Sequence, residues 1–96
     1  MIKHIVCFKL KDNSDLQKAK AKEVLMSMEG NVPQIRGIQV GCDFLKSSRS
    51  FDVVLEILLD SKEDLADYQN DPYHCSVVKK YMHEVRTDSV AIDYEL

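Results

Sequence analysis

Four segments of this sequence alternate between apolar and polar residues with a period of two, and helical spacings separate them in a defined order. The first segment, residues 2–10, gathers five residues on one face: Ile2, His4, Val6, Phe8 and Leu10. The alternation returns over residues 38–44, 51–59 and 90–96. Because successive side chains of a strand point to opposite faces, each segment predicts a β-strand.

The first helical segment follows Ser14. Gln17 stands three residues later, the spacing of a capping box. The apolar residues that follow have helical spacing: Ala21, Val24, Leu25 and Met28. Gly30 is expected to end this helix, and Pro33 prevents it from resuming.

The second helical region opens at Ser61, with Asp64 three residues later. The Asp71-Pro72 pair interrupts it. The same pair also supplies a good N-cap and first residue for a further helix, which we expect to run to about Glu84.

The resulting order, β-α-β-β-α-β, predicts a single α+β domain over residues 1–96, a ferredoxin-like sandwich with an antiparallel sheet. The helices cover one face of the sheet. The other face is predicted to carry both apolar and polar residues: Ile5, Cys7, Val54, Leu58 and Ala91 with Gln39, Glu56 and Asp93. A second copy is the simplest cover for such a face, so we expect a homodimer that forms a dimeric αβ-barrel.

Composition narrows the range of partners. The formal net charge is −3 and no run of Lys or Arg exceeds two residues, which argues against nucleic-acid binding. No apolar stretch approaches the roughly 18 residues of a membrane span, and the alternating residues 1–11 do not resemble a signal peptide. A cytoplasmic protein without a membrane partner is expected.

The chain has three cysteines, Cys7, Cys42 and Cys75. We expect them to be free thiols, because an odd number without a C-x-x-C pair suits neither a disulfide framework nor a zinc site.

Two histidines are predicted to converge between sheet and helices. His4 shares the inner face of the first strand with Val6 and Phe8. His74 shares a helical stripe with Val78 and Tyr81, and that stripe should face the sheet. Together with Tyr68, these residues form a candidate ligand-binding cleft. His83, nine residues beyond His74, is expected on the opposite, exposed side of the helix.

The chemistry of this cleft leaves three functions open. His74 lies in the first turn of its helix, where the dipole disfavours a positive charge, and a neutral imidazole suits a general base. The cleft is expected to bind a small, partly apolar ligand. Alternatively, a cofactor-free cyclase or lyase uses His74 as base, Tyr68 to steady an oxyanion and His4 to orient or relay. In the third reading the histidines are core residues of a structural dimer.

Other site types find little support. His4, His74 and Cys75 lack the spacing of a metal site, and two inward ligands are too few for zinc. Cys7 lies on the strand face opposite His4, which disfavours a Cys–His nucleophile pair. The glycines form no phosphate loop. No cofactor is therefore expected from the residues themselves.

Four stretches of the sequence resemble the stress-responsive αβ-barrel (Dabb) domain family, over essentially the whole chain. They are residues 2–12 (IKHIVCFKLKD), 32–38 (VPQIRGI), 67–74 (DYQNDPYH) and 92–94 (IDY). The resemblance implies a dimeric ferredoxin-like barrel. The family includes plant polyketide cyclases, and likeness to them implies a catalytic cleft formed by His4, Tyr68 and His74, with His74 as the base. This sequence lacks the tyrosine that those cyclases carry in the first helix.

The same resemblance bears on cofactors. Some plant relatives hold a magnesium ion on backbone carbonyls after the first helix, which implies Glu29, Val32 and Ile35 as the corresponding positions here. Heme-degrading monooxygenases share the barrel but use an Asn/Trp/His arrangement. This chain contains no Trp, which disfavours that function.

Overall fold

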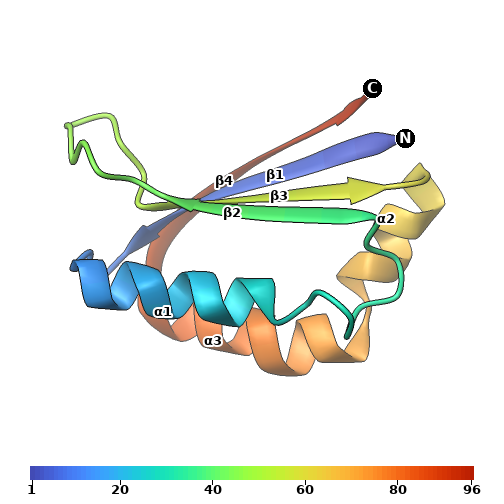
Figure 1. The fold of residues 1–96 in the computed structure, drawn as a ribbon, viewed down its shortest axis with the longest axis horizontal. Coiled ribbons are helices and arrows are strands. Elements are labelled where there is room, and N and C mark those ends of the chain that lie inside the picture. Colours follow the sequence, from blue (N-terminus) through green and yellow to red (C-terminus); the bar gives the residue numbers. More distant parts are fainter.

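Four strands form one antiparallel sheet, and the helices pack against a single face of it (Figure 1). The computed structural model describes residues 1–96, and its strands are β1 (Ile2–Leu10), β2 (Gly37–Cys42), β3 (Val53–Leu59) and β4 (Arg86–Glu95). Helix α1 (Asp15–Met26) follows β1, and three helical elements lie between β3 and β4: α2 (Lys62–Gln69), η1 (His74–Lys79) and α3 (Lys80–Val85). The strand order is β2-β3-β1-β4, so the predicted ferredoxin-like fold is confirmed. None of the helices has the length and apolar character needed to cross a membrane.

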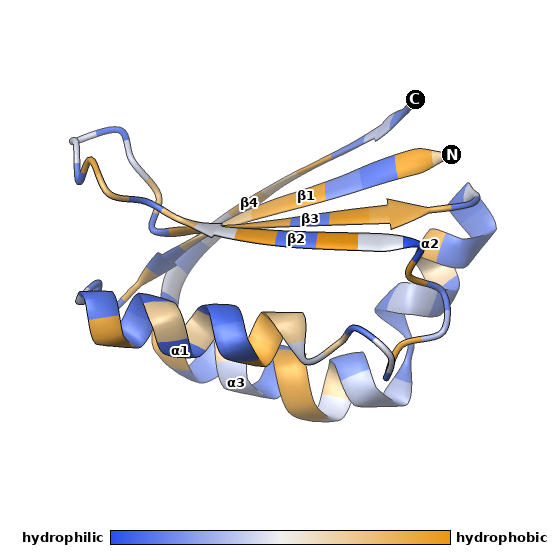
Figure 2. Ribbon diagram, viewed as in Figure 1, coloured by the Kyte–Doolittle hydropathy of each residue, from blue (hydrophilic) through white to orange (hydrophobic).

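The core lies between the inner face of the sheet and the helices. Strand β3 buries every second residue, as its alternation predicts: Val53, Leu55, Ile57 and Leu59. The strands in Figure 2 accordingly carry alternating hydrophobic and hydrophilic bands. Across the core, α1 completely buries Ala21 and Leu25 of its predicted stripe, and the turn after α1 buries Met28. Full burial of each large apolar side chain contributes about 1.5–3 kcal/mol, so this layer provides much of the stability.

Both predicted serine caps form. The Ser14 hydroxyl accepts a hydrogen bond from the Gln17 amide at 3.3 Å, and the Ser61 hydroxyl accepts one from the Asp64 amide at 3.1 Å. In a capping box, the side chain three residues after the cap accepts a hydrogen bond from the amide of the cap residue. Here the Asp12 carboxylate accepts that bond from the Ser14 amide instead, at 3.0 Å. Helix α1 ends at Met26, earlier than predicted, and turns lead to a positive φ of 82° at Gly30.

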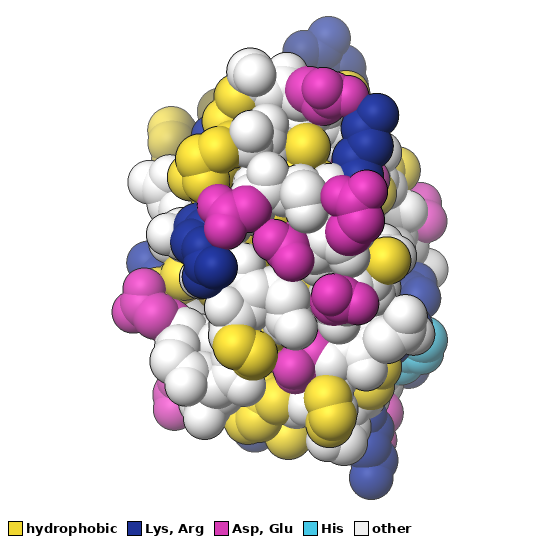
Figure 3. All heavy atoms as spheres, turned by 90° about the vertical axis from the view of Figure 1, so that its right-hand side faces the viewer, with side chains coloured by type: hydrophobic (Ala, Val, Ile, Leu, Met, Phe, Trp, Pro, Cys, Tyr) yellow, Lys and Arg dark blue, Asp and Glu magenta, His cyan; other side chains and the backbone are white.

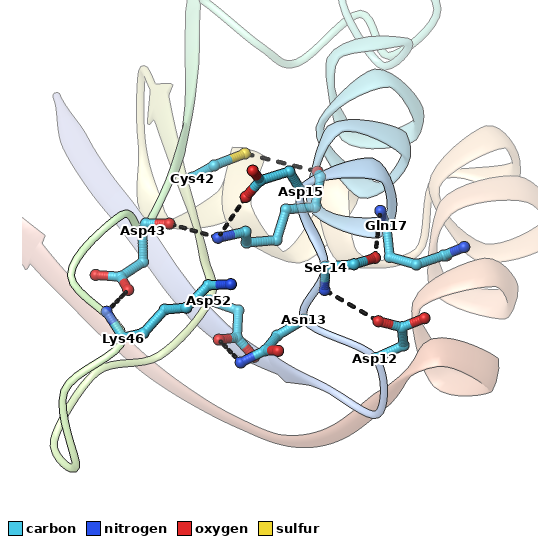
Figure 4. A network of polar contacts seen from close by, with 10 residues as sticks. Asp12, Asn13, Ser14, Asp15, Gln17, Cys42, Asp43, Lys46 and Asp52 are labelled. Carbon is cyan, nitrogen blue, oxygen red and sulfur yellow. Dashed lines mark hydrogen bonds and ion pairs between the residues drawn. The ribbon is translucent and has the colours of Figure 1, made fainter.

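A polar network closes the end of the sandwich where α1 begins (Figure 4). The buried Asp52 carboxylate accepts hydrogen bonds from the Leu10 amide at 2.7 Å and from the Asn13 side chain at 3.5 Å. The Lys18 side chain is also buried, and its Nζ donates to the Asp43 carbonyl at 2.7 Å. These contacts join the end of β1 and the start of α1 to the β2–β3 hairpin.

The helix after Asp71-Pro72 begins with a π-helical segment, η1. The predicted N-cap is present, because the Asp71 carboxylate accepts a hydrogen bond from the His74 amide at 3.1 Å. Residues 74–79 then follow the wider π-helical turn before α3 begins. A π-helix has more residues per turn than an α-helix, so each residue rotates the chain less. Side chains beyond Lys79 therefore face other directions than a regular helix predicts.

Strand β4 presents the opposite faces from those predicted. Ile92 lies directly across from Ile5, and Asp93 lies across from His4. Paired residues share a face of the sheet, so Asp93 points toward the helices. The prediction that Ala91 and Asp93 lie on the outer face was wrong. Alternation shows which residues share a face, but only the register with β1 decides which way that face points.

Strand β2 ends at Cys42, although the alternation predicted a strand that continues to Phe44. Phe44 is 92% exposed in the loop between β2 and β3. The Asp43 carboxylate accepts a hydrogen bond from the Lys46 amide at 2.8 Å, and Lys46 has a positive φ of 53°. This side-chain turn takes the chain out of the sheet one residue after Cys42.

The outer face of the sheet is more apolar than predicted. Half-buried residues of β1 and β3 lie beside exposed residues of β4, and together they form what we call the outer sheet face: Ile5, Cys7, Val54, Leu58, Val90, Ile92 and Tyr94. The Lys3 and Glu56 side chains form an ion pair on the same face at 3.5 Å. The β4 residues stay largely exposed in the monomer, with Ile92 at 59%.

Candidate functional site

A cavity of about 500 Å³ lies between the inner face of the sheet and the C-terminal helical region. This volume falls within the roughly 300–1,000 Å³ typical of small-molecule sites. The apolar part of the wall comes mainly from Val6, Phe8, Leu25, Leu55, Val78 and Met82. The polar part comes from His4, Tyr68, Gln69, Asn70, His74, Lys79, His83, Arg86 and Ser89.

His4 enters the cavity from β1, as its position in the alternation predicts, and it is 7% exposed. Its Nδ1 atom is hydrogen-bonded to the Asp93 carboxylate on β4. Such a carboxylate fixes the ring orientation and favours the N–H on Nδ1, which leaves Nε2 as the acceptor. Asp93 was absent from the predicted site because the face of β4 was assigned wrongly. The signal that could have found it is the cross-strand register of His4 and Asp93.

Tyr68 lies between the two imidazole rings. Its ring centroid is 5.6 Å from that of His4, edge to face, and 4.5 Å from that of His74, stacked. The ring is almost fully buried, which raises the pKa of Tyr68 well above its usual range and keeps the phenol neutral. The Tyr68 hydroxyl has only a weak partner, the Met28 sulfur at 3.8 Å. The predicted trio of His4, Tyr68 and His74 therefore forms one contiguous group of rings.

His74 stands at the start of η1 and lines the cavity. Burial and the nearby Lys79 charge lower the pKa of His74, and the nearby Gln69 backbone acts in the opposite direction. Its Nδ1 atom is buried without a hydrogen-bond partner. His74 thus offers a neutral imidazole with one unused nitrogen at neutral pH.

The π-helical turn changes which helical residues reach the cavity. Val6, Phe8 and Val78 line it, whereas Tyr81 lies outside the lining and packs half-buried against the core. His83 was expected on the far side of the helix; it is exposed, yet it lies in the cavity wall. The smaller rotation per residue in η1 accounts for both shifts, because both residues follow it.

The turn after α1 is where the resemblance implies a magnesium ion. The Val32 carbonyl accepts a hydrogen bond from the Ile35 amide at 3.3 Å, and the nearby Gln34 Oε1 is buried without a partner. Carbonyl oxygens suit magnesium, so the backbone carbonyls of Glu29, Val32 and Ile35 and the Gln34 side-chain oxygen match such an ion in ligand type. An ion there would brace the α1–β2 connection. None of these residues lines the cavity.

Cysteine and metal chemistry lie apart from this site. All three cysteines are free thiols, with Cys7 half-buried on the outer sheet face and Cys42 and Cys75 exposed. No three His, Cys, Asp or Glu side chains come close enough together to hold a metal ion.

Comparison with known proteins identifies the family. The sequence model of the Dabb family, the stress responsive A/B barrel domain, matches residues 2–96. The chain belongs to the Dabb family. A stress-response A/B barrel domain-containing protein of Arabidopsis thaliana is 33% identical to this Dabb chain over 95 residues, or 98% of the chain. This chain spans 36% of the length of that plant protein.

Solved structures share the Dabb chain's fold. A dimeric protein of unknown function with a ferredoxin-like fold, from Bacteroides fragilis, is 26% identical, with a TM-score of 0.82 and coverage of 99% of this chain and 95% of that one. A hydroxynitrile lyase from Passiflora edulis has a TM-score of 0.81 at 17% identity, covering 99% of this chain and 92% of its own. The second likeness shows the fold alone. The family recognised from the sequence is confirmed.

Proposed function

We propose that this Dabb domain binds a small, partly apolar ligand with an enolisable carbonyl group in the cavity between sheet and helices. The unpartnered Nδ1 of His74 carries the proposal. A buried polar atom without a hydrogen bond costs about 1–3 kcal/mol, so a ligand that bonds to it recovers that free energy. The apolar wall provides the rest of the contact surface.

Two polar groups of the cavity, His74 Nδ1 and the Tyr68 hydroxyl, can form opposite kinds of hydrogen bond with a ligand. We propose that the N–H of His74 is on Nε2, which leaves the unpartnered Nδ1 as an acceptor. Nδ1 then accepts a hydrogen bond, while the Tyr68 hydroxyl donates one. An enolisable carbonyl compound matches both, since it has an acidic proton and an acceptor oxygen on neighbouring atoms.

A second candidate function, proton transfer, is favoured by the pairing of His4 with Asp93. In this reaction His74 Nδ1 takes the proton next to the carbonyl, the electrons of the broken C–H bond form a C=C bond to the carbonyl carbon, and the carbonyl π electrons move onto the oxygen. The Tyr68 hydroxyl stabilises the resulting enolate. His4, held by Asp93, offers Nε2 to relay a proton. A hydroxynitrile lyase shares the fold, so the fold is compatible with lyase chemistry.

Both candidates are tested with one probe, 1-phenylpropan-2-one. Binding should shift the NMR signals of His74 and of the cavity wall, and solvent deuterium should enter the probe next to its carbonyl faster than in buffer. His74→Gln should remove the accelerated exchange, whereas Lys20→Gln, at an exposed position of α1 outside the cavity wall, should retain it. Binding without exchange would leave the domain a ligand-binding protein. Absence of binding, with a large loss of stability in His74→Gln, would identify the histidines as core residues.

We further propose that the domain works as a homodimer joined through the outer sheet face. Seven apolar side chains lie on that face, and in the monomer Val90, Ile92 and Tyr94 remain 42–59% exposed. The Bacteroides fragilis relative is dimeric and shares the fold over nearly its whole length. A second copy would cover these side chains and leave the cavity, on the opposite face of the sheet, accessible.

A further inference from the structure

We propose that the ligand of the cavity is an anion, with an apolar body among the core side chains and a carboxylate held at the rim by Lys79 and Arg86. This inference rests on the proposed function, because it names the charge of the compound that the cavity takes. It follows from the distribution of charge around the cavity.

The charge of the cavity wall is opposite to that of the chain. The sequence has 16 acidic and 13 basic residues, yet no Asp or Glu lines the cavity, whereas Lys79 and Arg86 do. Acidic side chains gather instead on the end of the molecule where α2 lies (Figure 3). Two carboxylates lie just behind the wall, and both are engaged: Asp93 with the His4 ring and Asp71 with the His74 amide.

The two cations of the rim lack protein partners. Four ion pairs of Lys or Arg with Asp or Glu form elsewhere in the chain, and neither Lys79 nor Arg86 takes part in any of them. Lys79 and His83 are four residues apart along the helical segment, and Arg86 begins β4 immediately after α3. All three line the same cavity, and Lys79 and Arg86 form a cationic rim over its apolar wall. The Lys79 charge also reaches inward, since it contributes to the lowered pKa of His74.

This arrangement specifies an amphipathic anion. Phe8, Leu25 and Leu55 provide apolar surface toward the core, where a charged group would lose its hydration. At the rim, a guanidinium offers paired N–H donors to a carboxylate or phosphate, and the lysine adds a second charge. A carboxylate therefore suits a rim with two fixed cations. A phosphate is the alternative anionic group that could bind at the same rim.

Three probes of similar shape separate these cases: 3-phenylpropanoate, the neutral 3-phenylpropanamide and 2-phenylethyl phosphate. Isothermal titration calorimetry at low salt should show the propanoate binding roughly threefold to tenfold more tightly than the amide, as expected for two partly exposed charge pairs. Added salt should reduce this preference, because it screens exposed charges. Tighter binding of the phosphate than of the propanoate would overturn the carboxylate assignment and assign a phosphate ligand.

Single substitutions test which residues cause the preference for the propanoate over the amide. Lys79→Met and Arg86→Met should each reduce the ratio of propanoate to amide affinity, because each removes a charge that only the propanoate pairs with. Lys80→Met removes a neighbouring exposed lysine outside the cavity wall and should leave the ratio as in the wild type. Lys79 is exposed, so Lys79→Met should fold normally. This variant therefore tests the proposal even if Arg86→Met is unstable. Equal affinities for the acid and the amide would overturn the anion preference alone. Failure of all three probes to bind would overturn the proposed cavity function and this inference with it.

Discussion

The Nδ1 atom of His4 is hydrogen-bonded to the carboxylate of Asp93, its direct neighbour across the β1–β4 pairing. This contact determines which nitrogen of the His4 ring is available to the cavity. Because the two residues come from opposite ends of the chain, the final strand completes a group of rings that begins in the first one. The relationship leads to the first of four predictions.

Asp93→Asn should change the tautomer of His4 while the fold is retained. The asparagine amide can donate to Nδ1, so the ring proton is expected to move to Nε2. Long-range 1H–15N spectra of the histidine side chains would show this change at His4 and leave His74 unaffected. Asp88→Asn, an exposed change on the same strand, serves as the control. An unchanged His4 tautomer would mean that the Asp93 contact does not govern the ring.

Acidification should destabilise the fold through His74. Burial and the Lys79 charge lower the pKa of His74 below the ordinary value of 6.5, so the unfolded chain takes up this proton at a higher pH than the folded one. The free energy of unfolding should therefore fall as the pH drops from about 6.5 through the folded pKa, and this contribution should stay constant above about 6.5. NMR titration should give a His74 midpoint below 6.5, and urea unfolding should show a weaker acid dependence for His74→Gln. A midpoint above 6.5 would contradict the burial argument.

Charged substitutions on the outer sheet face should dissociate the dimer. Ile92 is 59% exposed in the monomer, so Ile92→Lys should leave folding intact while placing a charge inside the interface. Val54→Lys tests the centre of the same face. Leu16→Lys is the matched control, because Leu16 is an exposed apolar residue on α1, at 75%. Light scattering should show that the wild-type protein and the Leu16→Lys variant are dimers and that the Ile92→Lys variant is a monomer. If the Ile92→Lys protein is still a dimer, the interface lies on another surface.

Removal of the Asp52 carboxylate should be the most damaging change in the polar network of Figure 4. Asp52→Ala leaves the buried Leu10 amide without its acceptor, which should lower the free energy of unfolding by about 1–3 kcal/mol. Asp12→Ala removes a comparable hydrogen bond to the Ser14 amide at an exposed position and should cost less. Chemical denaturation of the two variants would compare them directly. Equal losses would show that burial of the Asp52 contact is unimportant.

Most of the fold follows from local patterns. Alternation marks β1 and β3, and the two serine caps mark the starts of α1 and α2, because each depends on residues within a few positions of one another. His4 could be placed in the cavity for the same reason. His74 could be placed there because it lies in the first turn after its cap, before the π-helical geometry changes the direction of later residues.

The sequence by itself determined the order of elements, the inner faces of β1 and β3 and the meeting of His4, Tyr68 and His74. Only the tertiary structure decided that Asp93 supports His4 and that His83, rather than Tyr81, reaches the cavity. The first depends on the register of an edge strand, where either face can be apolar when a second copy is available to cover the outer one. The second depends on a π-helical turn between Asp71 and α3, and the spacing of apolar residues does not encode so small a change in rotation per residue.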